Sequence, residues 1–362
     1  MSVQGLMQQF VLPPPPHEEF LTWGGNFHGQ LGQGDLINSL TPIRLPGTDW
    51  KQIECGSEHV LALRKDGLLF GWGRNDFGQL GDGTTVPKMS PVQIGTIRWQ
   101  KIACGFFHSL GMNDFGQLFT WGSNFAGQLG TNDLTDRSTP TLIGVNRHRD
   151  IAGGSNHSLT IDHDNQLYAC GRNTYGQLGD GTTTNRLTLT LVTGTFLQIS
   201  AGDNFSIAIN HIGDVMTFGL NAFGAIGDGT TINRLTPTLI SLPVIKTRKV
   251  LSYANGNMAL LHSGIVFTWG GNSNFEIGDG TTTNRLTPFQ INTHRYTDIS
   301  AGKNGATLSA IASNGDLWTW GNNANGEYGN GNVVTLAFPT VQTHTRKWLK
   351  MARGNNFAIA QV

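Results

Sequence analysis

The stretch Trp72-Gly73-Arg74-Asn75-Asp76-Phe77-Gly78-Gln79-Leu80-Gly81 decides the fold, because versions of it recur along the chain. Successive copies start 49, 49, 49, 48, 51 and 51 residues apart. The copies begin at Trp23, Trp72, Trp121, Cys170, Phe218, Trp269 and Trp320. A period of this length is typical of propellers, solenoids and other repeat arrays. The repeat is therefore the unit from which we predict the fold.

Three positions of the repeat are the same in every copy. A glycine follows the large first residue, as Gly24, Gly73, Gly122, Gly171, Gly219, Gly270 and Gly321. An asparagine follows, as Asn26, Asn75, Asn124, Asn173, Asn221, Asn272 and Asn323. A second glycine closes each copy, as Gly32, Gly81, Gly130, Gly179, Gly227, Gly278 and Gly329. Glycines at fixed repeat positions mark turns rather than a flexible linker.

The strands expected in one repeat are clearest in the second copy. Residues 51–55, 59–63, 68–72 and 91–94 each form a short strand candidate, and Lys65-Asp66-Gly67 between the second and third is a tight hairpin signal. No helical periodicity is sustained between these segments. Four short strands every 49 residues describe one blade of an all-β propeller.

The two ends of the chain complete each other. The first repeat starts directly at residues 20–23, without its first two strands, whereas residues 353–359 match the strand pair at 201–207. The C-terminal strands are therefore expected to complete the first blade and to leave no exposed sheet edge. We predict that residues 20–362 form a closed seven-bladed β-propeller of four-stranded blades.

Residues 1–19 lie outside the repeat and read as an N-terminal arm. Leu6, Met7, Phe10 and Val11 are apolar, and the prolines at 13–16 form an extended polyproline spacer. The alternative is a disordered tail, which is common at chain ends. We expect the arm to act in assembly, by docking on a neighbouring chain or on its own propeller.

Composition narrows the class of function. The chain has 362 residues, a net charge of zero and only 13% charged residues, which argues against a large nucleic-acid or anionic-membrane footprint. No apolar run could span a bilayer, and no basic region precedes an apolar core at the N-terminus. The sequence thus predicts no secretory signal and synthesis in the cytoplasm. Cys55, Cys104 and Cys170 form no disulfide framework and read as small buried residues.

The repeat resembles the regulator of chromosome condensation repeat. The resemblance rests on Trp-Gly-x-Asn-x-x-Gly-Gln-Leu-Gly, whose last four residues are complete at 29–32, 78–81, 127–130 and 176–179, and it covers residues 20–362. It implies a propeller, but it does not select a function. Family members include a nucleotide exchange factor for a nuclear GTPase, ubiquitin-ligase modules, bacterial effectors and a secreted β-lactamase inhibitor. The exchange factors carry an inserted wedge, for which the regular spacing here leaves no room.

Several polar motifs travel with the repeat and are interpreted as structural. His59, His108 and His157 lie on successive blades, too far apart to share a metal. Asp82 and its counterparts follow glycines but lack the helix and lysine of a phosphate loop and the oxygen ligands of a calcium loop. Arg186, Arg234, Arg285 and, more weakly, Arg137 are expected to pair with the preceding aspartate loop. We therefore expect no metal, no cofactor and no catalytic residues, so the chain is not predicted to be an enzyme.

Residues that depart from the repeat are better candidates for recognition. Exposed aromatic side chains on a rigid rim suit protein binding. The alternative for each of them is packing between blades. The partner-binding candidates are Phe27, His28, Phe77, Phe106, Phe107, Tyr175, Phe223 and Phe275.

The favoured function is a non-enzymatic propeller that serves as a structural or attachment component of a larger assembly, such as a bacteriophage virion. The arm, the low charge and the loops rich in threonine, asparagine and glycine favour this hypothesis. The alternative is a free-standing interaction or inhibitor module, and a GTPase exchange factor is disfavoured. The expected partner is a protein or a neighbouring subunit, with no nucleic acid, no membrane insertion and no small-molecule substrate.

Overall fold

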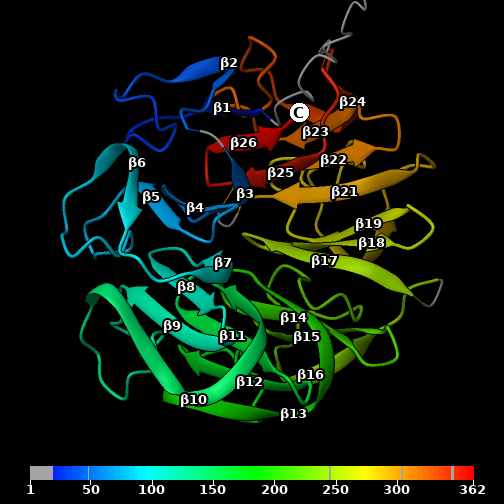
Figure 1. Ribbon diagram of the computed structural model, residues 1–362. Helices are drawn as coiled ribbons and strands as arrows, with labels where there is room; N and C mark the ends of the chain where they lie inside the picture. The colour runs from blue at the N-terminus through cyan, green and yellow to red at the C-terminus, as the bar shows by residue number, and fades with distance from the viewer. Residues whose placement is uncertain (1–18, 48, 244–245, 303–304, 344–345) are drawn as a thin grey trace, which may run out of the picture.

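The computed structural model describes residues 19–47, 49–243, 246–302, 305–343 and 346–362. In this part of the chain there are twenty-six β-strands and no helix, so the all-β prediction is confirmed. The strands form sheets arranged around a common centre, as in a propeller (Figure 1). The predicted assembly residues Leu6, Met7, Phe10 and Val11 lie outside the described residues.

Most of the sheets have four antiparallel strands, and in three of these sheets the strand order follows the chain. The second repeat contains β3 (Trp50–Cys55), β4 (His59–Arg64), β5 (Leu69–Gly73) and β6 (Lys88–Ile94). The sixth contains β17 (Thr247–Tyr253), β18 (Gly256–Leu261), β19 (Val266–Gly270) and β20 (Arg285–Gln290). The seventh contains β21 (Tyr296–Ala301), β22 (Thr307–Ala312), β23 (Leu317–Gly321) and β24 (Leu336–Val341). The four strand segments predicted for the second repeat are thus confirmed to within a few residues.

The third, fourth and fifth repeats share one continuous set of ten paired strands. The first part of this set is β7 (Trp99–Cys104), β8 (His108–Asn113), β9 (Gln117–Gly122) and β10 (Arg137–Gly153). It continues through β11 (His157–Asp162), β12 (Gln166–Gly171), β13 (Arg186–Ala201), β14 (Phe205–Asn210), β15 (Val215–Gly219) and β16 (Arg234–Ile240). Strands β10 and β13 each pair with one sheet through their first half and with the next sheet through their second half.

The long strands β10 and β13 differ from the separate short strands that we expected. Each joins the outer strand of one repeat to the inner strand of the next without a break in extended structure. These two connections contain no proline, whereas Pro46 and Pro243 lie in the connections that follow β2 and β16. The absence of proline permits this extension but does not explain it alone, because residues 95–98 between β6 and β7 also lack proline and interrupt the strand.

The two chain ends meet in one sheet, as predicted. Its order is β2 (Ser39–Arg44), β1 (Phe20–Gly24), β26 (Phe357–Gln361) and β25 (Lys350–Arg353). Leu21 pairs with Ala360 and Trp23 with Ala358, so the last strand of the chain lies beside the first. The C-terminal segment thus supplies the two strands that the first repeat lacks.

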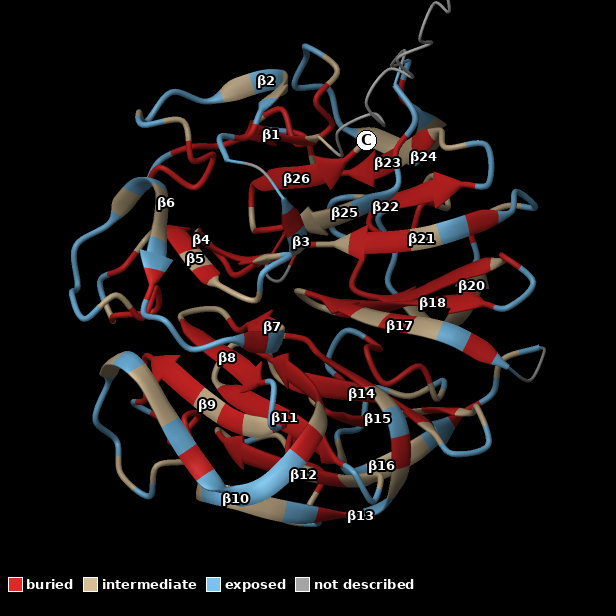
Figure 2. Cartoon of the chain, in the orientation of Figure 1, coloured by how far each residue is buried: buried red, intermediate tan, exposed pale blue. Residues whose placement is uncertain are grey.

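The core lies between neighbouring sheets. One cluster combines Leu31, from the connection between β1 and β2, and Phe357 of the sheet that holds the chain ends with Val60 and Trp72 of the second repeat. Figure 2 shows the same division, with buried residues along the inner strands and exposed residues along outer strands such as β10. Because each cluster is shared by two sheets, no sheet can bury its apolar face alone.

In the repeats that have it, the first tryptophan of the motif joins its sheet to the preceding repeat by a hydrogen bond. Trp72 is fully buried and its Nε1 donates a hydrogen bond of 2.9 Å to the carbonyl of Gln30. Trp121 makes the same bond to Gln79 at 2.9 Å, and Trp23 bonds Glu327 at 2.8 Å across the chain ends. These bonds explain why the Trp-Gly pair recurs at a fixed spacing.

The closing glycine of each repeat makes room for this indole. Gly32 has a φ of +72°, and a Cβ added there would lie 3.0 Å from Nε1 of Trp72. Gly81 has a φ of +81° and its added Cβ would lie 2.8 Å from Nε1 of Trp121. Any other residue would meet both a strained backbone and a contact with the indole, which explains the invariant glycine.

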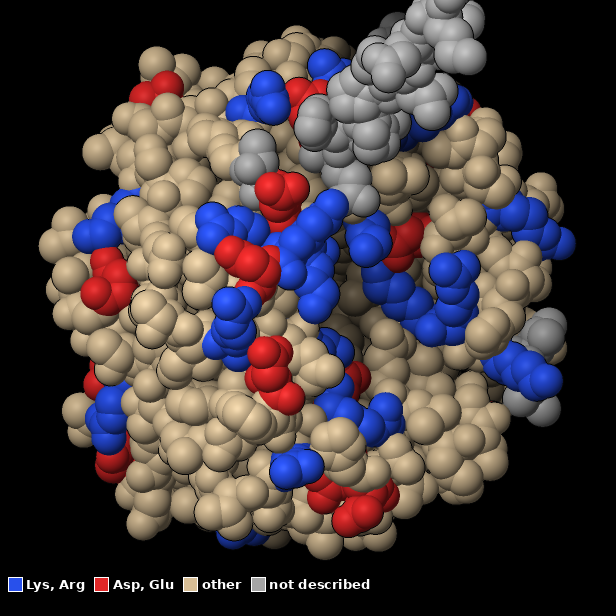
Figure 3. Space-filling model, viewed as in Figure 1, with Lys and Arg blue, Asp and Glu red and all other residues tan. Residues whose placement is uncertain are grey.

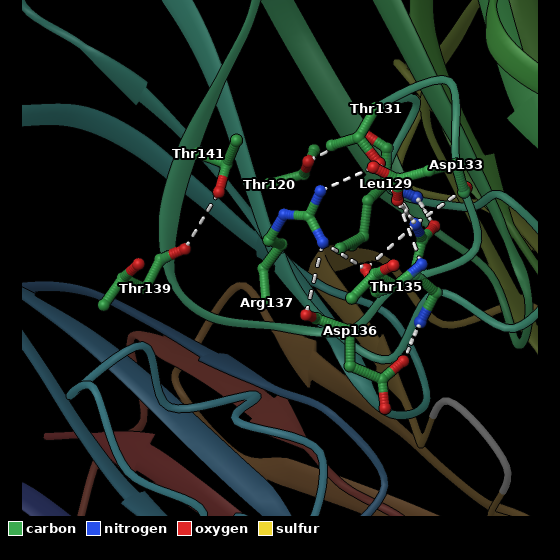
Figure 4. A network of polar contacts seen from close by, with 10 residues as sticks. Thr120, Leu129, Thr131, Asp133, Thr135, Asp136, Arg137, Thr139 and Thr141 are labelled. Atoms are coloured by element: carbon green, nitrogen blue, oxygen red, sulfur yellow. Dashed lines mark hydrogen bonds and ion pairs between the residues drawn. The ribbon is translucent and has the colours of Figure 1, made fainter.

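The invariant asparagine holds the long connection between the third and fourth strands. In the third repeat, Asn124 Nδ2 donates to Thr131 Oγ1 at 3.0 Å and to the Asp133 and Thr135 carbonyls at 3.0 and 3.2 Å. Its Oδ1 accepts the Leu129 N–H at 3.0 Å. Figure 4 shows the same loop with Arg137 reaching the carboxylate of Asp133. Asn124 thus replaces secondary-structure hydrogen bonds that this excursion lacks.

The recurring histidines are buried packing residues, as predicted, and they also bridge repeats. His59 Nε2 lies 3.1 Å from Ser109 Oγ, whose own proton goes to the Gln79 carbonyl at 2.7 Å. His59 Nε2 is therefore the donor, and its Nδ1 finds no hydrogen-bond partner among the described residues. Burial lowers the pKa of His59 from 6.5 to about 3. The equivalent pairs are His108 with Ser158 at 2.9 Å and His157 with Ser206 at 3.0 Å.

The stability of the protein should therefore begin to fall below about pH 6.5, at a higher pH than that at which its carboxylates are protonated. Below pH 6.5 the unfolded chain binds a proton at His59 that the folded chain rejects until about pH 3, so the free energy of unfolding falls as pH falls. The loss is about 1.4 kcal/mol per pH unit for this one group, or about 2–3 kcal/mol by pH 4.5. Urea denaturation at pH 7 and pH 4.5 measures it.

The matched control for this pH effect is His59→Phe. Phe205 and Phe357 occupy the equivalent position in other repeats, so phenylalanine fits this site in the fold. Ser109 keeps its bond to the Gln79 carbonyl in this variant. The variant should lose less stability between pH 7 and pH 4.5 than the wild type. An identical loss in both proteins would contradict the assignment to His59.

Candidate functional site

The propeller has two faces, which the antiparallel strands distinguish. The turn face carries the connections from first to second strand and from third to fourth strand of each repeat. The hairpin face carries the connections from second to third strand and those between repeats. All eight partner-binding candidates lie in connections of the turn face.

An aromatic patch lies on the turn face where the second and third repeats meet. It consists of Phe77, Phe106 and Phe107, all half-buried, with Arg74. The Phe106 and Phe107 ring centroids are 4.3 Å apart in an edge-on arrangement, and those of Phe77 and Phe107 are 5.3 Å apart. The Arg74 guanidinium carbon lies 4.7 Å from the centroid of the Phe107 ring, within cation–π range. Three predicted residues are thus brought together.

Charged side chains border the aromatic patch. Arg74 donates to Glu58 Oε2 at 2.9 Å and to Asp76 Oδ2 at 2.6 Å. Burial opposes the charged form of Arg74, but these two carboxylates outweigh it and raise its pKa. His28, a fourth predicted residue, places Nε2 3.4 Å from the same Glu58 oxygen. The patch and the charged side chains that border it therefore come from three successive repeats.

Backbone hydrogen bonds hold the patch in place. The Phe106 carbonyl accepts from Ser57 N at 3.3 Å, and the Phe106 N–H donates to Gly154 O at 3.0 Å. The Phe107 carbonyl accepts from Ser123 N at 2.9 Å. The two Phe106 bonds cross to the second and fourth repeats, and the Phe107 bond joins two connections of the third repeat. The aromatic rings are therefore presented on a rigid frame. Little conformational entropy remains to be lost when a partner binds.

The other predicted residues lie apart from the patch on the turn face. Phe27 is 54% exposed and Phe223 is 43% exposed, as expected of contact residues. Tyr175 is half-buried in its turn. Phe275 stands where other repeats have glycine and adopts a φ of +65°, so it is a strained position within the turn.

Sequence reasoning missed four residues of this site. Phe125 is 57% exposed and occupies the same turn position as Phe27, so the repeat alignment alone could have identified it. Arg74, Glu58 and Asp76 were missed because isolated surface charges carry no sequence signal. Only the folded second repeat shows that they converge, because Glu58 precedes β4 whereas Arg74 and Asp76 follow β5.

The repeated arginines pair locally, as predicted, and do not form a separate anion site. The Asp180, Asp228 and Asp279 carboxylates have lowered pKa values, because hydrogen bonds from the neighbouring threonines and arginines outweigh the opposing effect of burial. The pairs are Arg186 with Asp180 at 2.6 Å, Arg234 with Asp228 at 2.5 Å and Arg285 with Asp279 at 2.6 Å.

The cysteines and the possible metal ligands of the described residues were compared with the expectations from the repeat. Cys55, Cys104 and Cys170 are buried and none of them forms a disulfide with another described residue, and burial raises the pKa of Cys170 to about 12. Among the residues that the structure describes, no three His, Cys, Asp or Glu side chains gather as ligands of one ion. In the same residues no helix has the length and apolar character needed to cross a membrane.

The fold and the Trp-Gly repeat define a β-propeller of one particular class. The family model described as the RCC1-like domain matches residues 17–258. The model of the regulator of chromosome condensation (RCC1) repeat matches residues 263–308 and 314–361. The chain therefore belongs to the RCC1-like family, as the repeat motif predicted.

Solved propellers share this fold at low sequence identity. Human WBSCR16 superimposes with a TM-score of 0.86 and 22% identity, over 95% of this chain and 98% of that one. Prp20p from Saccharomyces cerevisiae, described with its binding to Gsp1p and histones, superimposes with a TM-score of 0.84 and 20% identity, over 95% and 91%. At these identities the likeness establishes the fold alone.

Sequence similarity to curated relatives is local. The ultraviolet-B receptor UVR8 of Arabidopsis thaliana is 41% identical over 56 residues, which are 15% of this chain and 13% of the receptor. The match thus spans far less than the full length of that relative.

Proposed function

We propose that this propeller is a protein-recognition module whose contact surface is the aromatic patch on the turn face. The observation that carries the proposal is the packed group of Phe77, Phe106 and Phe107 with Arg74 stacked on it. Aromatic residues and arginine are the side chains most often found at binding hot spots. The binding of Gsp1p and histones by the similar Prp20p supports a protein partner as the class of ligand.

The geometry of the patch favours binding over catalysis. The Arg74 guanidinium is held by Glu58 and Asp76, so it is oriented rather than free to act as an acid or base. Its flat side covers Phe107, which leaves an amphipathic surface of ring edges beside charged groups. We propose accordingly that the chain works without turnover, metal or cofactor.

Substitution of the patch should abolish partner binding without unfolding the protein. We expect Phe107→Ala or Arg74→Gln to weaken binding by about 2 kcal/mol or more, which is roughly 30-fold in Kd. Partners would be identified by cross-linking in the native source with wild-type protein. Affinities would then be measured by calorimetry with the purified partner, after thermal melting has shown that each variant is folded.

The matched control is Phe115→Ala, which removes the same side chain from the hairpin face of the third repeat. Phe115 is 71% exposed and lies in the hairpin between β8 and β9. This variant should bind the partner like the wild type. Equal binding by all three variants would refute the patch as the contact surface.

We also infer that the ring is closed and has seven blades. Support comes from the inner strands, each of which contacts the next around the centre. The contacts run from β25 to β3, β7, β10, β13, β17 and β21, and β21 contacts β25 in turn. The shared sheet of β1 and β26 supports the same conclusion.

We propose two more specific roles for such a recognition module, attachment within a larger assembly and interaction with or inhibition of a free partner. Attachment within a larger assembly, including a virion, would use the turn face together with the N-terminal arm. Deleting residues 1–12 should then abolish incorporation into the assembly but leave thermal melting unchanged. An interaction or inhibitor module would need the turn face alone and would tolerate the same deletion.

A further inference from the structure

The central channel gathers positive charge in a chain whose net charge is zero. Most of the lysines and arginines of the inner strands lie toward the hairpin face, as Lys51, Lys249 and Lys350 do near the first residues of β3, β17 and β25. Figure 3 shows Lys and Arg side chains around the hollow at the centre of the molecule. The cations at this position are Lys51, Lys101, Arg149, Arg248, Lys249 and Lys350.

Nearby carboxylates compensate only part of this charge. Asp150 pairs with Lys101, and Asp298 pairs with Lys249 at 2.5 Å. Among the described residues, Lys51, Arg248 and Lys350 form no ion pair, although each is exposed at the channel. Cations held around a concave surface raise the local concentration of anions.

Two adjoining cavities lie inside the channel, each of about 170 Å³. The outer cavity is lined by Lys51, Lys249 and Lys350, which come from three different strands. Both cavities are lined by Lys249 and Glu54, so they lie next to each other in the channel. Glu54 is a carboxylate in this wall, and Gln52 Nε2 donates to it at 3.0 Å.

A buried arginine lines the inner cavity. Arg353 is 3% exposed and stands where β3 and β7 end in cysteine. Its Nε donates to Ser309 Oγ at 2.8 Å and its Nη1 to the Glu327 carbonyl at 2.9 Å, but Nη2 has no hydrogen-bond partner among the described residues. Burial lowers its pKa to about 10, so it remains charged at neutral pH. The negative charge of Glu327 favours the charged form of Arg353, but among the described residues no carboxylate forms an ion pair with its guanidinium. A buried charge that is only partly compensated is costly, and a bound anion would lower this cost.

We propose that the central channel binds a small ligand carrying two or more phosphate groups. Lysines on β3, β17 and β25 reach one cavity from three sides, which suits several anionic oxygens better than a single carboxylate. The cations gather at one hollow instead of following a stripe across the surface, which disfavours a nucleic-acid backbone. The two cavities together have the size of a small-molecule site rather than of a protein interface. This site lies apart from the aromatic patch and does not depend on it.

Calorimetry with tripolyphosphate tests the proposal on the full chain. We expect micromolar binding that weakens as salt is raised and that exceeds the binding of inorganic phosphate at least tenfold. The Lys51→Gln/Lys350→Gln double variant should bind tripolyphosphate at least tenfold more weakly. Both side chains are exposed, so the variant should fold, and thermal melting verifies this.

The matched control is Lys88→Gln, which removes a lysine from the outer strand β6, where it pairs with Asp82 at 3.1 Å. This control should bind tripolyphosphate like the wild type. No binding at physiological salt, equal loss in the control, or tighter binding of a polyglutamate peptide would each overturn the proposal. Partner binding through Phe107 is measured separately, so the two proposals fail independently.

Discussion

A chain that lacks residues 348–362 should fail to fold into a cooperative monomer. The deletion removes β25 and β26, and with them Phe357 and Ile359 from the core shared with the second repeat. It also removes Trp348, which is 2% exposed and packs 5.4 Å from Trp23. Strand β1 would keep only β2 as a partner and would expose an apolar edge. Size-exclusion chromatography and thermal melting should show aggregation or loss of the folding transition.

A circular permutant separates loss of the strands from loss of chain length. The Val362 N–H donates to the Glu19 carbonyl at 3.0 Å, so the last residue lies beside the start of β1. Residues 348–362 can therefore be joined ahead of β1 through a short turn, which restores the first sheet from contiguous chain. This permutant should melt cooperatively as a monomer. A truncated chain that stayed monomeric with an unchanged melting transition would refute the requirement for these strands.

The architecture could be predicted because the same pattern of residues occurs in every repeat of the sequence. Each copy carries a large residue, a glycine, an asparagine and a second glycine at fixed spacing, so chance departures in one copy do not hide the pattern. The tryptophan bond to the preceding repeat was not predictable, because it joins residues 42 positions apart, Trp72 and Gln30. The merging of strands in β10 depends on local backbone extension, which the periodicity does not report.

The recognition surface could be predicted only in part. Phe106 and Phe107 depart from the repeat and are therefore visible in the sequence. Arg74 and Glu58 look like ordinary surface charges until the second repeat is folded, when their side chains meet at 2.9 Å. Lys51 and Lys350 are likewise unremarkable in sequence, since they lie 299 positions apart and only the meeting of the chain ends brings them to one cavity.

Trp72→Ala should lower the free energy of unfolding by about 3–5 kcal/mol, the usual cost of removing a large buried aromatic side chain. The Trp72 side chain is fully buried and packs against Trp50, with ring centroids 6.1 Å apart. Its removal would leave a cavity between the first and second repeats. It would also leave the Gln30 carbonyl without its indole donor. Chemical denaturation measures the loss, and a value below about 1 kcal/mol would place the indole outside the core.

Trp72→Phe divides this cost between packing and hydrogen bonding. Phe218 occupies the equivalent place in the fifth repeat, so phenylalanine is compatible with the fold there, but it has no N–H to donate. The phenylalanine variant should therefore lose about 1–3 kcal/mol, the cost of an unsatisfied buried carbonyl, and the alanine variant should lose more. Equal losses in the two variants would mean that the hydrogen bond to Gln30, and not the volume of the ring, joins the two repeats.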